Sequence, residues 1–386
     1  MSEFRATVAT VHLRNLQENF ARFRSWLKPE AFICPMVKAN AYGLGDEAVV
    51  RALSEAGARH FGIALVEEGL HLRTVGVQEN LLLFGGFSAR AARTIIDSRL
   101  IPVVGRWAEI EALASELPAR AQFPVHLKFN TGMNRLGFAS DQVERLGEYF
   151  RGQDRLQLSG VCTHLHSGED ILDGAGFSVD QLTEFARVAD HFRSFAVVEH
   201  ALNSVSVMAL HKADQEGALP LWGERWRAGA RPGIALYGAN PCPTLFPTLR
   251  PLPVLHWQTE VALVRQLEPG ESVSYGARWR AAKRTRLAVL PIGYADGYSR
   301  TLGQRSEVLI RGQRVPVVGT VCMDYLFVDL SGLSDSAAVT VGEPVVLAGE
   351  QGGEFIGVEE LAQFAATIPY EILVGIGQRV PRHYVK

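Results

Sequence analysis

The chain has 386 residues, of which 47% are hydrophobic and 21% are charged, and its formal net charge is -2. This balance, without clustered Lys and Arg, excludes the basic surface of a nucleic-acid-binding protein, and no apolar run reaches the roughly 18–20 residues of a membrane span. The length exceeds what one hydrophobic core usually serves, so we expect two domains.

Residues 1–240 alternate between short apolar runs and amphipathic stretches. A first helix is predicted at Leu13–Leu27, where apolar residues recur at helical spacing. A second is predicted at Glu47–Ala56, with Asp46 and Gly57 as its caps. The pattern Ser178-Val179-Asp180-Gln181 predicts a capping box at the start of another helix.

Short strands rich in β-branched residues are predicted between these helices. They are Phe32–Val37, His60–Leu65, Asn80–Phe84, Ile101–Val104, Val125–Phe129, Leu158–Thr163, Val197–Leu202 and Arg231–Tyr237. Strands alternating with helices over this length fit a (β/α)8 barrel, which typically has about 250 residues. A doubly wound sheet is the less favoured alternative. We therefore predict an α/β fold with a TIM-like barrel over residues 1–240.

The composition changes after Asn240, where prolines crowd the segment from Pro241 to Pro253 and predict a linker. Turn signals such as Pro269-Gly270 and Gly352-Gly353 then separate short β-rich runs. The runs are Thr259–Val264, Arg286–Leu290, Glu307–Ile310, Val315–Val318, Tyr325–Leu330 and Pro344–Ala348, and one short helix is predicted at Val358–Ala365. Residues 241–386 are thus predicted to form a mostly β C-terminal domain.

Cysteine usage and the first residues bear on the cellular compartment. Cys34, Cys162, Cys242 and Cys322 are far apart and form no CxxC pair, so we predict free thiols and no metal site. Met1–Asn15 lacks the long apolar core of a secretory signal peptide. Together these features predict a cytoplasmic protein.

Lys38 is the first candidate for chemistry, because it follows the first predicted strand of the barrel and barrel enzymes place catalysis at that end of a strand. Position alone equally fits a lysine extending from a strand end. The segment Gly43–Ala48, with Glu67 downstream, also fits a dinucleotide-binding fingerprint. Its first glycine comes about five residues after the strand, too late for a pyrophosphate turn, so a dehydrogenase is disfavoured.

Further motifs occur in one order along the chain. They are Lys38–Gly43 (KANAYG), Lys128–Gly137 (KFNTGMNRLG), Asn203-Ser204, Arg231–Gly238 (RPGIALYG), Val273–Gly276 (VSYG), Gly293–Gly297 (GYADG), Cys322–Asp324 (CMD) and Ile368–Glu371 (IPYE). Together they resemble the motifs of alanine racemases, pyridoxal phosphate (PLP) enzymes built on a barrel and a β domain. Because the motifs extend from residue 38 to residue 371, the resemblance covers essentially the whole chain.

The resemblance implies interconversion of L- and D-alanine with PLP, supplying D-alanine for peptidoglycan. Lys38 would carry PLP as a Schiff base and serve as one catalytic base. Racemisation removes a proton from one face of the α-carbon and returns it to the other, and the resemblance supplies Tyr275, from the partner subunit of a homodimer, as the second base. A phenol with its usual pKa of ~10 is a poor base at neutral pH. His164 and Arg231 match the family residues that polarise it.

The cofactor contacts are likewise implied by the resemblance. Arg231 is expected at the pyridine nitrogen, and because arginine does not readily release its proton it should leave that nitrogen unprotonated and disfavour transamination. The phosphate is expected to meet Tyr42, Ser204, Tyr370 and the backbone N–H groups of Gly233 and Ile234.

The substrate contacts come from the same resemblance. Arg135 is expected at the substrate carboxylate and the phenolic oxygen of PLP. Lys128, which carries a carbamate in several relatives, is expected to orient Arg135. The backbone N–H of Met323 is expected to meet the substrate carboxylate from the partner chain, with Tyr294 and Asp324 as supporting residues.

Two segments depart from the family pattern. Thr320 stands where relatives usually have an arginine, and Leu165–Asp170 replaces a stretch of small residues ending in an acid. Both regions line the access channel in the family, so alanine is the favoured substrate while serine or lysine remains an alternative. A non-catalytic PLP-binding barrel protein is disfavoured by the second domain and Tyr275. A PLP decarboxylase is disfavoured by Arg231.

Overall fold

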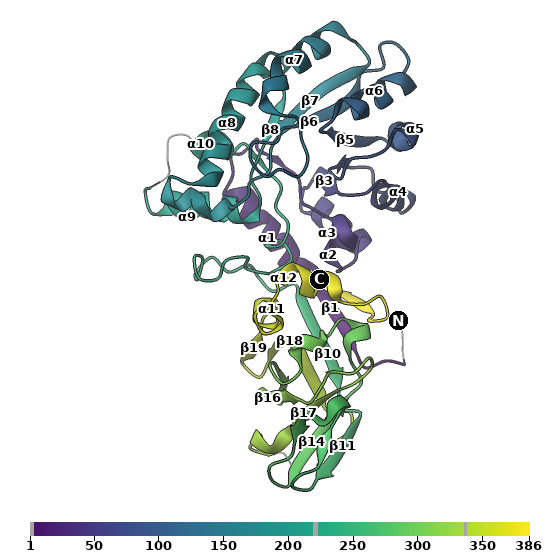
Figure 1. Ribbon diagram of the computed structural model, residues 1–386, viewed down its shortest axis with the longest axis vertical. Helices are drawn as coiled ribbons and strands as arrows, with labels where there is room; N and C mark the ends of the chain where they lie inside the picture. Colours follow the sequence, from purple (N-terminus) through teal and green to yellow (C-terminus); the bar gives the residue numbers. More distant parts are fainter. Residues whose placement is uncertain (1–3, 219–222, 336–337) are drawn as a thin grey trace.

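The computed structural model has two parts, a barrel in the upper half of the view in Figure 1 and a mostly β part in the lower half. It describes residues 4–218, 223–335 and 338–386. Strand β1 (Val8–His12) lies in the lower part and helix α1 (Leu13–Ser25) in the upper part, so the chain crosses between them near its start.

The upper part is a closed barrel of parallel strands. Within the described residues these strands are β2 (Phe32–Ile33), β3 (His60–Ile63), β4 (Asn80–Leu83), β5 (Leu100–Val104), β6 (Phe123–Lys128), β7 (Leu156–Cys162), β8 (Val198–His200) and β9 (Gly229–Ala230). Strands β3 to β8 pair in chain order, and β2 pairs with β9. The bridges Met36–Gly62 and Leu202–Ala230 connect that pair to β3 and β8. The predicted (β/α)8 barrel is confirmed.

Helices surround the barrel (Figure 1) and bury their apolar faces on it. After α1 they are α3 (Asp46–Glu55), α4 (Val66–Thr74), α5 (Ala92–Asp97), α6 (Trp107–Glu116), α7 (Val143–Gly152), α8 (Phe177–His191), α9 (Ser204–Gln215) and α10 (Gly223–Trp226). In α1 the residues buried at helical spacing include Leu16, Phe20 and Phe23, as the sequence pattern predicts.

The predicted capping box of α8 is wrong. The helix begins at Phe177 after Gly176, so Ser178 and Gln181 lie inside its first turns. Their side chains bind the loop that follows β7 instead: Ser178 donates to the carbonyl of Ser167 at 2.6 Å, and Gln181 donates to the carbonyl of His164 at 3.0 Å. The two side chains that resemble a capping box therefore stabilise the loop after β7 and do not cap the helix.

The lower part is a twisted, mostly antiparallel sheet, and its described residues also form two α-helices. Its elements are β10 (Leu255–Glu260), β11 (Leu263–Leu267), β12 (Ser272–Val273), β13 (Trp279–Arg280), β14 (Thr285–Leu290), β15 (Glu307–Ile310), β16 (Gln313–Val318), β17 (Leu326–Asp329), β18 (Pro344–Gln351), β19 (Glu354–Ile356), β20 (Arg382–Val385), α11 (Val358–Ala365) and α12 (Pro369–Gly375). The predicted mostly β character is confirmed. The single run expected at Thr259–Val264 is divided between β10 and β11.

The N-terminal strand belongs to the lower sheet, since β1 pairs antiparallel with β10 and parallel with β20. The predicted boundary between the domains at residue 240 stays a prediction. Strand β1, which comes before that residue, belongs to the sheet of the lower part. Among the helices of the described residues, none has the length and apolar character that crossing a membrane requires.

Candidate active site

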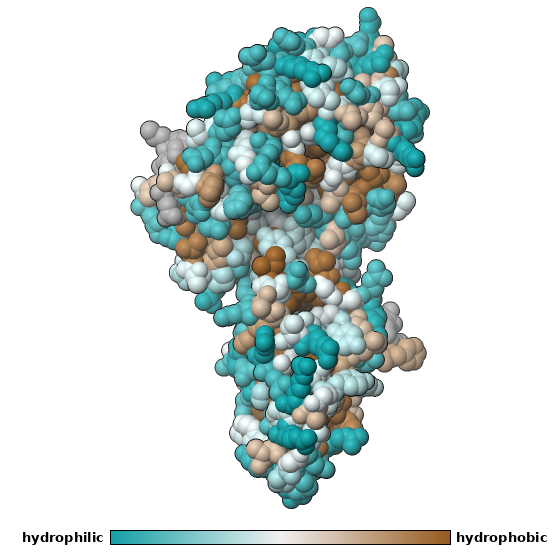
Figure 2. Space-filling view, viewed as in Figure 1, coloured by the Kyte–Doolittle hydropathy of each residue, from teal (hydrophilic) through white to brown (hydrophobic). Residues whose placement is uncertain are grey.

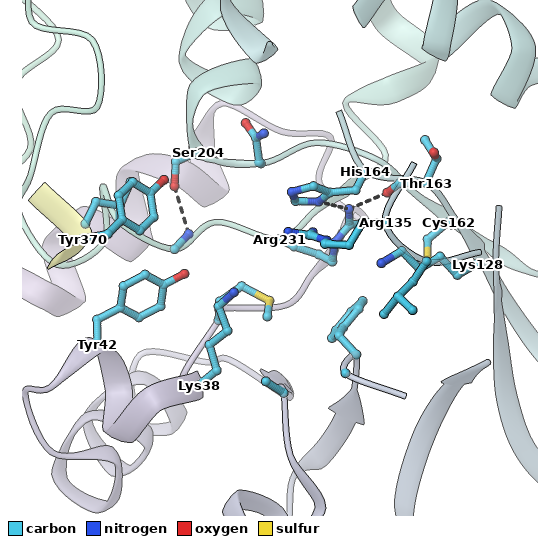
Figure 3. Close-up of a pocket in the computed structure, with 18 residues that line it drawn as sticks. Lys38, Tyr42, Lys128, Arg135, Cys162, Thr163, His164, Ser204, Arg231 and Tyr370 are labelled. Carbon is cyan, nitrogen blue, oxygen red and sulfur yellow. Dashed lines mark hydrogen bonds between the residues drawn. The ribbon is translucent and has the colours of Figure 1, made fainter. Parts of the chain in front are cut away.

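A cavity of about 390 Å³ lies at the C-terminal ends of the barrel strands. Four of the residues predicted for the site, Tyr275, Tyr294, Met323 and Asp324, are not among its lining residues. The predicted residues that do line it are Lys38, Tyr42, Lys128, Arg135, His164, Ser204, Arg231, Gly233, Ile234 and Tyr370 (Figure 3).

Lys38 begins α2 (Lys38–Tyr42), a turn of left-handed backbone. The φ angles of Ala39, Asn40, Ala41 and Tyr42 are 53°, 54°, 51° and 55°. This conformation costs roughly 1–2 kcal/mol per L-residue, so it persists only where its surroundings fix it. Glu68 accepts a hydrogen bond from the backbone N–H of Ala39 at 2.7 Å, and Arg382 donates to the carbonyl of Gly43 at 2.8 Å. Lys38 is thus presented to the cavity from an anchored turn.

The glycines of the dinucleotide-like segment serve packing. A Cβ on Gly43 would lie 2.5 Å from the carbonyl oxygen of Leu373, and one on Gly45 would overlap the phenol of Tyr384. Both contacts come from the C-terminal elements α12 and β20. The segment therefore accommodates a neighbouring chain segment, and the dehydrogenase interpretation finds no support in it.

Arg231 is buried in the wall of the cavity, and its terminal nitrogens are fully used. Nη1 donates to His200 Nδ1 at 2.7 Å and to the carbonyl of His200 at 2.6 Å. Nη2 donates to the carbonyls of Thr163 at 2.6 Å and Ala201 at 3.3 Å, and lies 3.4 Å from His164 Nδ1. Nε forms no hydrogen bond with any described residue. Since a guanidinium has five N–H donors, Nε–H is the one left for a ligand.

The histidines around Arg231 are neutral, and their tautomers follow from it. Because a guanidinium only donates, the Nδ1 atoms of His164 and His200 accept, which places each ring proton on Nε2. Burial, followed by the charge of Arg231, lowers the pKa of both rings well below the usual value. His200 Nε2 then donates to His126 Nδ1 at 2.8 Å, and burial lowers the pKa of His126 to about 3.

Positive charge dominates the cavity. Burial, followed by the charge of Arg135, lowers the pKa of Lys38. Burial also lowers the pKa of Lys128, with repulsion from Arg231, Arg135 and Lys38 acting in the same direction. No Asp or Glu is among the lining residues that the structure describes. Such a cavity attracts anions, and its lysines become neutral, nucleophilic amines more readily than free lysine does.

One end of the cavity suits a phosphate. Ser204 begins α9, whose N-terminus favours anions, and its Oγ accepts from Gly233 N at 2.9 Å (Figure 3). A Cβ on Gly233 would overlap the phenol of Tyr42, and Ile234 N–H bonds to no described residue. Tyr370 lines the same end. These are hydroxyl and backbone donors, and a side chain at residue 233 would displace the Tyr42 phenol from among them.

The four predicted residues outside the cavity lie on the β part. The Tyr275 side chain is 71% exposed and that of Met323 is 51% exposed. Tyr294 N donates to the carbonyl of Cys322 at 3.0 Å, which fixes the loop bearing Met323, whose own N–H bonds to no described residue. Asp324 pairs with Arg379 at 2.5 Å. A single chain therefore does not bring Tyr275 to Lys38.

Several residues that position the site were not identified from sequence. The sequence pattern assigns Gln181 to a helix cap, and Glu68 and Thr163 belong to no motif. His200 ends β8 and faces inward, a placement that strand alternation could have suggested. All four cysteines are free thiols, and of these Cys162 lines the cavity.

Comparison with known proteins covers both parts of the chain. Residues 11–241 match the family model described as alanine racemase, N-terminal domain, and residues 254–384 match alanine racemase, C-terminal domain. The chain is 36% identical to an alanine racemase of Sorangium cellulosum over 98% of this chain and 99% of the relative. It is 38% identical to one from Symbiobacterium thermophilum over 98% and 97%.

Solved structures agree with these matches. An alanine racemase from E. faecalis superposes with a TM-score of 0.89 at 28% identity, covering 100% of both chains. An alanine racemase from Bartonella henselae with covalently bound pyridoxal phosphate has a TM-score of 0.85 at 28% identity, covering 98% of this chain and 99% of that one.

Proposed function

The chain belongs to the alanine racemase family and is a PLP-dependent racemase; on this premise we propose how its own residues interconvert L- and D-alanine. One observation carries the assignment of roles: the Lys38 amine lines the same cavity as Arg231, whose Nε–H is its one donor without a described partner. PLP, when bound, supplies an electron sink that makes the α-proton of the amino acid removable.

The donor set fits PLP at three points. Lys38 supplies the amine that carries the cofactor. Ser204, Tyr42, Tyr370 and the N–H of Ile234 would hold the phosphate, at the end of the cavity where residue 233 has no side chain. The N–H of Gly233, which donates to Ser204 Oγ at 2.9 Å, would join them by exchanging that bond for one to the phosphate. Arg231 Nε would donate to the ring nitrogen and leave it without a proton, which restrains charge from spreading into the ring.

Lys38 is proposed to move the α-proton on one face of the substrate. Its lowered pKa, caused by burial and then by Arg135, favours the neutral amine that this role requires. Arg135, which lines the cavity and forms no hydrogen bond with a described residue, is proposed to hold the substrate carboxylate through its planar fork of donors.

Tyr275 of the partner subunit is proposed to act on the opposite face. His164 would donate a hydrogen bond to the phenol, because Arg231 keeps His164 Nδ1 an acceptor and leaves its Nε2–H free to donate. A donor directed at the phenol oxygen stabilises the phenolate over the phenol, and the low pKa of His164 prevents a second proton from binding the ring. Gln181 holds the loop of His164 in place.

A homodimer with shared sites is proposed from the exposed surface. The side chains of Tyr275, Met323 and Tyr294 lie on the β part, and the residues are 71%, 51% and 43% exposed. None of these three side chains forms a hydrogen bond with a residue that the structure describes. Ile368 directly precedes α12 and Val374 lies within it, and they are 54% and 46% exposed. Helix α12 lies between the two parts, where Figure 2 shows apolar residues gathered. Large apolar side chains exposed together are typical of an interaction surface.

Lys128 is proposed to carry a carbamate. Its Nζ forms no hydrogen bond or ion pair with a described residue, and its burial among Arg231, Arg135 and Lys38 lowers its pKa. A neutral amine is the form that combines with CO2, forming a new N–C bond and releasing one proton to solvent. The resulting anion would attract Arg135, whereas an ammonium repels it.

The test uses hybrid dimers. Lys38→Ala and Tyr275→Phe homodimers should each fail to racemise L-alanine, followed as loss of circular dichroism with PLP bound. If each site takes Lys38 from one chain and Tyr275 from the other, mixed dimers contain one complete site. Random reassortment then restores about a quarter of wild-type activity in a two-fold dimer. A mixture that stays inactive although hybrids form would refute the shared site. Serine and lysine are run in parallel to define the substrate range.

A further inference from the structure

Ser274, the residue before Tyr275, has a backbone conformation that is almost confined to glycine. Its φ is 68° and its ψ is 179°. A side chain in this region strains the backbone, and such strain persists only where neighbouring contacts outweigh it. Gly276 follows with φ 77°. The segment that presents Tyr275 is therefore bent into a shape that its local sequence disfavours.

Two side chains hold this shape reciprocally. Ser274 Oγ donates to the carbonyl of Thr320 at 2.5 Å and lies 3.3 Å from Cys322 Sγ. Thr320 Oγ1 in turn donates to the carbonyl of Tyr275 at 2.9 Å. Thr320 is only 6% exposed, so these bonds are partly shielded from water.

The Tyr275 side chain itself is not fixed by its own chain. No described residue forms a hydrogen bond or ring contact with it, and it is 71% exposed. The backbone at residues 274–275 consequently sets the direction of the Cα–Cβ bond of Tyr275, and with it the region that the phenol can reach. A displacement of about 1 Å in a reacting group can cost on the order of 100-fold in rate, so this backbone geometry bears on catalysis.

We propose that Ser274 and Thr320 form a clamp that positions Tyr275 for proton transfer in the partner's active site. The inference rests on the proposed role of Tyr275 as second base. Both clamp residues are positioning residues, since neither touches the substrate. The clamp also joins Tyr275 to the segment Thr320–Met323. The backbone of Tyr275 and the backbone N–H of Met323, both proposed to act in the partner's site, therefore keep a fixed distance from each other.

Thr320 is tested with Thr320→Val, which keeps the shape of the side chain and removes its donor. We expect kcat to fall about 10- to 100-fold with little change in KM, and Thr320→Ser to recover most of the loss. The matched control is Thr285→Val, another buried threonine of the β part, whose Oγ1 donates to the carbonyl of Lys283 at 2.8 Å. It should retain wild-type kcat.

The diagnostic readout is the deuterium isotope effect with α-deuterated L- and D-alanine. A displaced Tyr275 slows proton transfer on one face only, so the isotope effect should rise for one enantiomer and not for the other. Ser274 separates strain from bonding. Ser274→Gly relieves the strain and loses the Oγ bond, whereas Ser274→Ala keeps the strain, so kcat should decrease in the order wild type, Gly, Ala.

Three results would overturn the clamp. If Thr320→Val matches Thr285→Val in kcat and isotope effects, the clamp is wrong while the role of Tyr275 stands. If kcat falls but the isotope effects stay unchanged for both enantiomers, the role of Thr320 is only structural. If Tyr275→Phe racemises normally, the second-base assignment fails and the clamp with it. Should Thr320→Val not fold, the Ser274→Gly and Thr320→Ser comparisons decide the question by the same readouts.

Discussion

Substituting Glu68 by Gln tests whether the turn bearing Lys38 depends on its anchor. The Glu68 carboxylate accepts from the backbone N–H groups of Ala39 at 2.7 Å, Ala64 at 2.7 Å and Leu65 at 3.1 Å. A glutamine has one acceptor oxygen, so its NH2 group must face at least one of these donors and lose that bond.

The expected magnitude follows from the environment of that bond. A hydrogen bond to a charged group contributes about 1.5–3 kcal/mol. Ala39 is exposed, so water replaces part of the loss, and we take about 1–2 kcal/mol. The left-handed turn itself stores about 4–8 kcal/mol over residues 39–42, so it is poorly able to absorb this loss. If the whole loss falls on the free energy of PLP binding, the dissociation constant of PLP rises about 5- to 30-fold.

The assay is titration of the apoprotein with PLP, followed by absorbance at equilibrium. The control is Glu67→Gln, which makes the same charge change at an exposed neighbour that forms no hydrogen bond or ion pair with a described residue. It should bind PLP as the wild type does. Equal dissociation constants for the two variants would refute the claim that Glu68 holds the turn.

Three further outcomes are expected. Burial lowers the pKa of three histidines in the folded chain: His126, His164 and His200. Below about pH 6.5 the unfolded chain therefore binds more protons than the folded chain, and the urea midpoint of unfolding should fall as the pH drops from 7.5 to 5.5. A midpoint that does not change with pH would contradict the buried, neutral state of these rings. Gly233→Ala places a Cβ against Tyr42 and should weaken PLP binding about 5- to 150-fold through overpacking of about 1–3 kcal/mol, whereas Gly152→Ala, with open space around it, should not. Removing CO2 from the buffers should raise KM for alanine until bicarbonate is restored, and Lys128→Met should show no such response; a carbamate is excluded if the wild type is equally indifferent.

The barrel was predictable because its signals are local. Apolar runs of strand length alternate with helix-length amphipathic stretches, and this pattern needs no knowledge of distant partners. The strand predicted at Arg231–Tyr237 shows where that reasoning fails. The strand is Gly229–Ala230, and residues 234–238 form a turn whose apolar side chains are buried below the phosphate end. Burial alone does not distinguish a turn from a strand.

Other features depend on contacts that are remote in sequence. Strand β1 has a short alternating pattern that becomes a strand by pairing with β20 at the other end of the chain. The left-handed turn at Ala39–Tyr42 contains no glycine, so no propensity predicts it, and it exists because Glu68 and Arg382 bind it. The residues assigned from the family resemblance meet at one cavity, while Gln181 and Glu68, which position them, carry no motif.

The chemistry of the cavity supports a base supplied from outside the chain. Burial raises the pKa of Cys162 and of Tyr42, and raises that of Tyr370 to about 12, so none of these groups accepts a proton readily near neutral pH. His164 is held neutral by a pKa too low for a strong base. Among the described lining residues this leaves Lys128 as the rival to Tyr275. If Lys128 were the second base, both bases would come from one chain, and the Tyr275→Phe homodimer would racemise alanine without a Lys38→Ala partner. Recovery of activity only in mixed dimers therefore separates the two assignments without any structure of the complex.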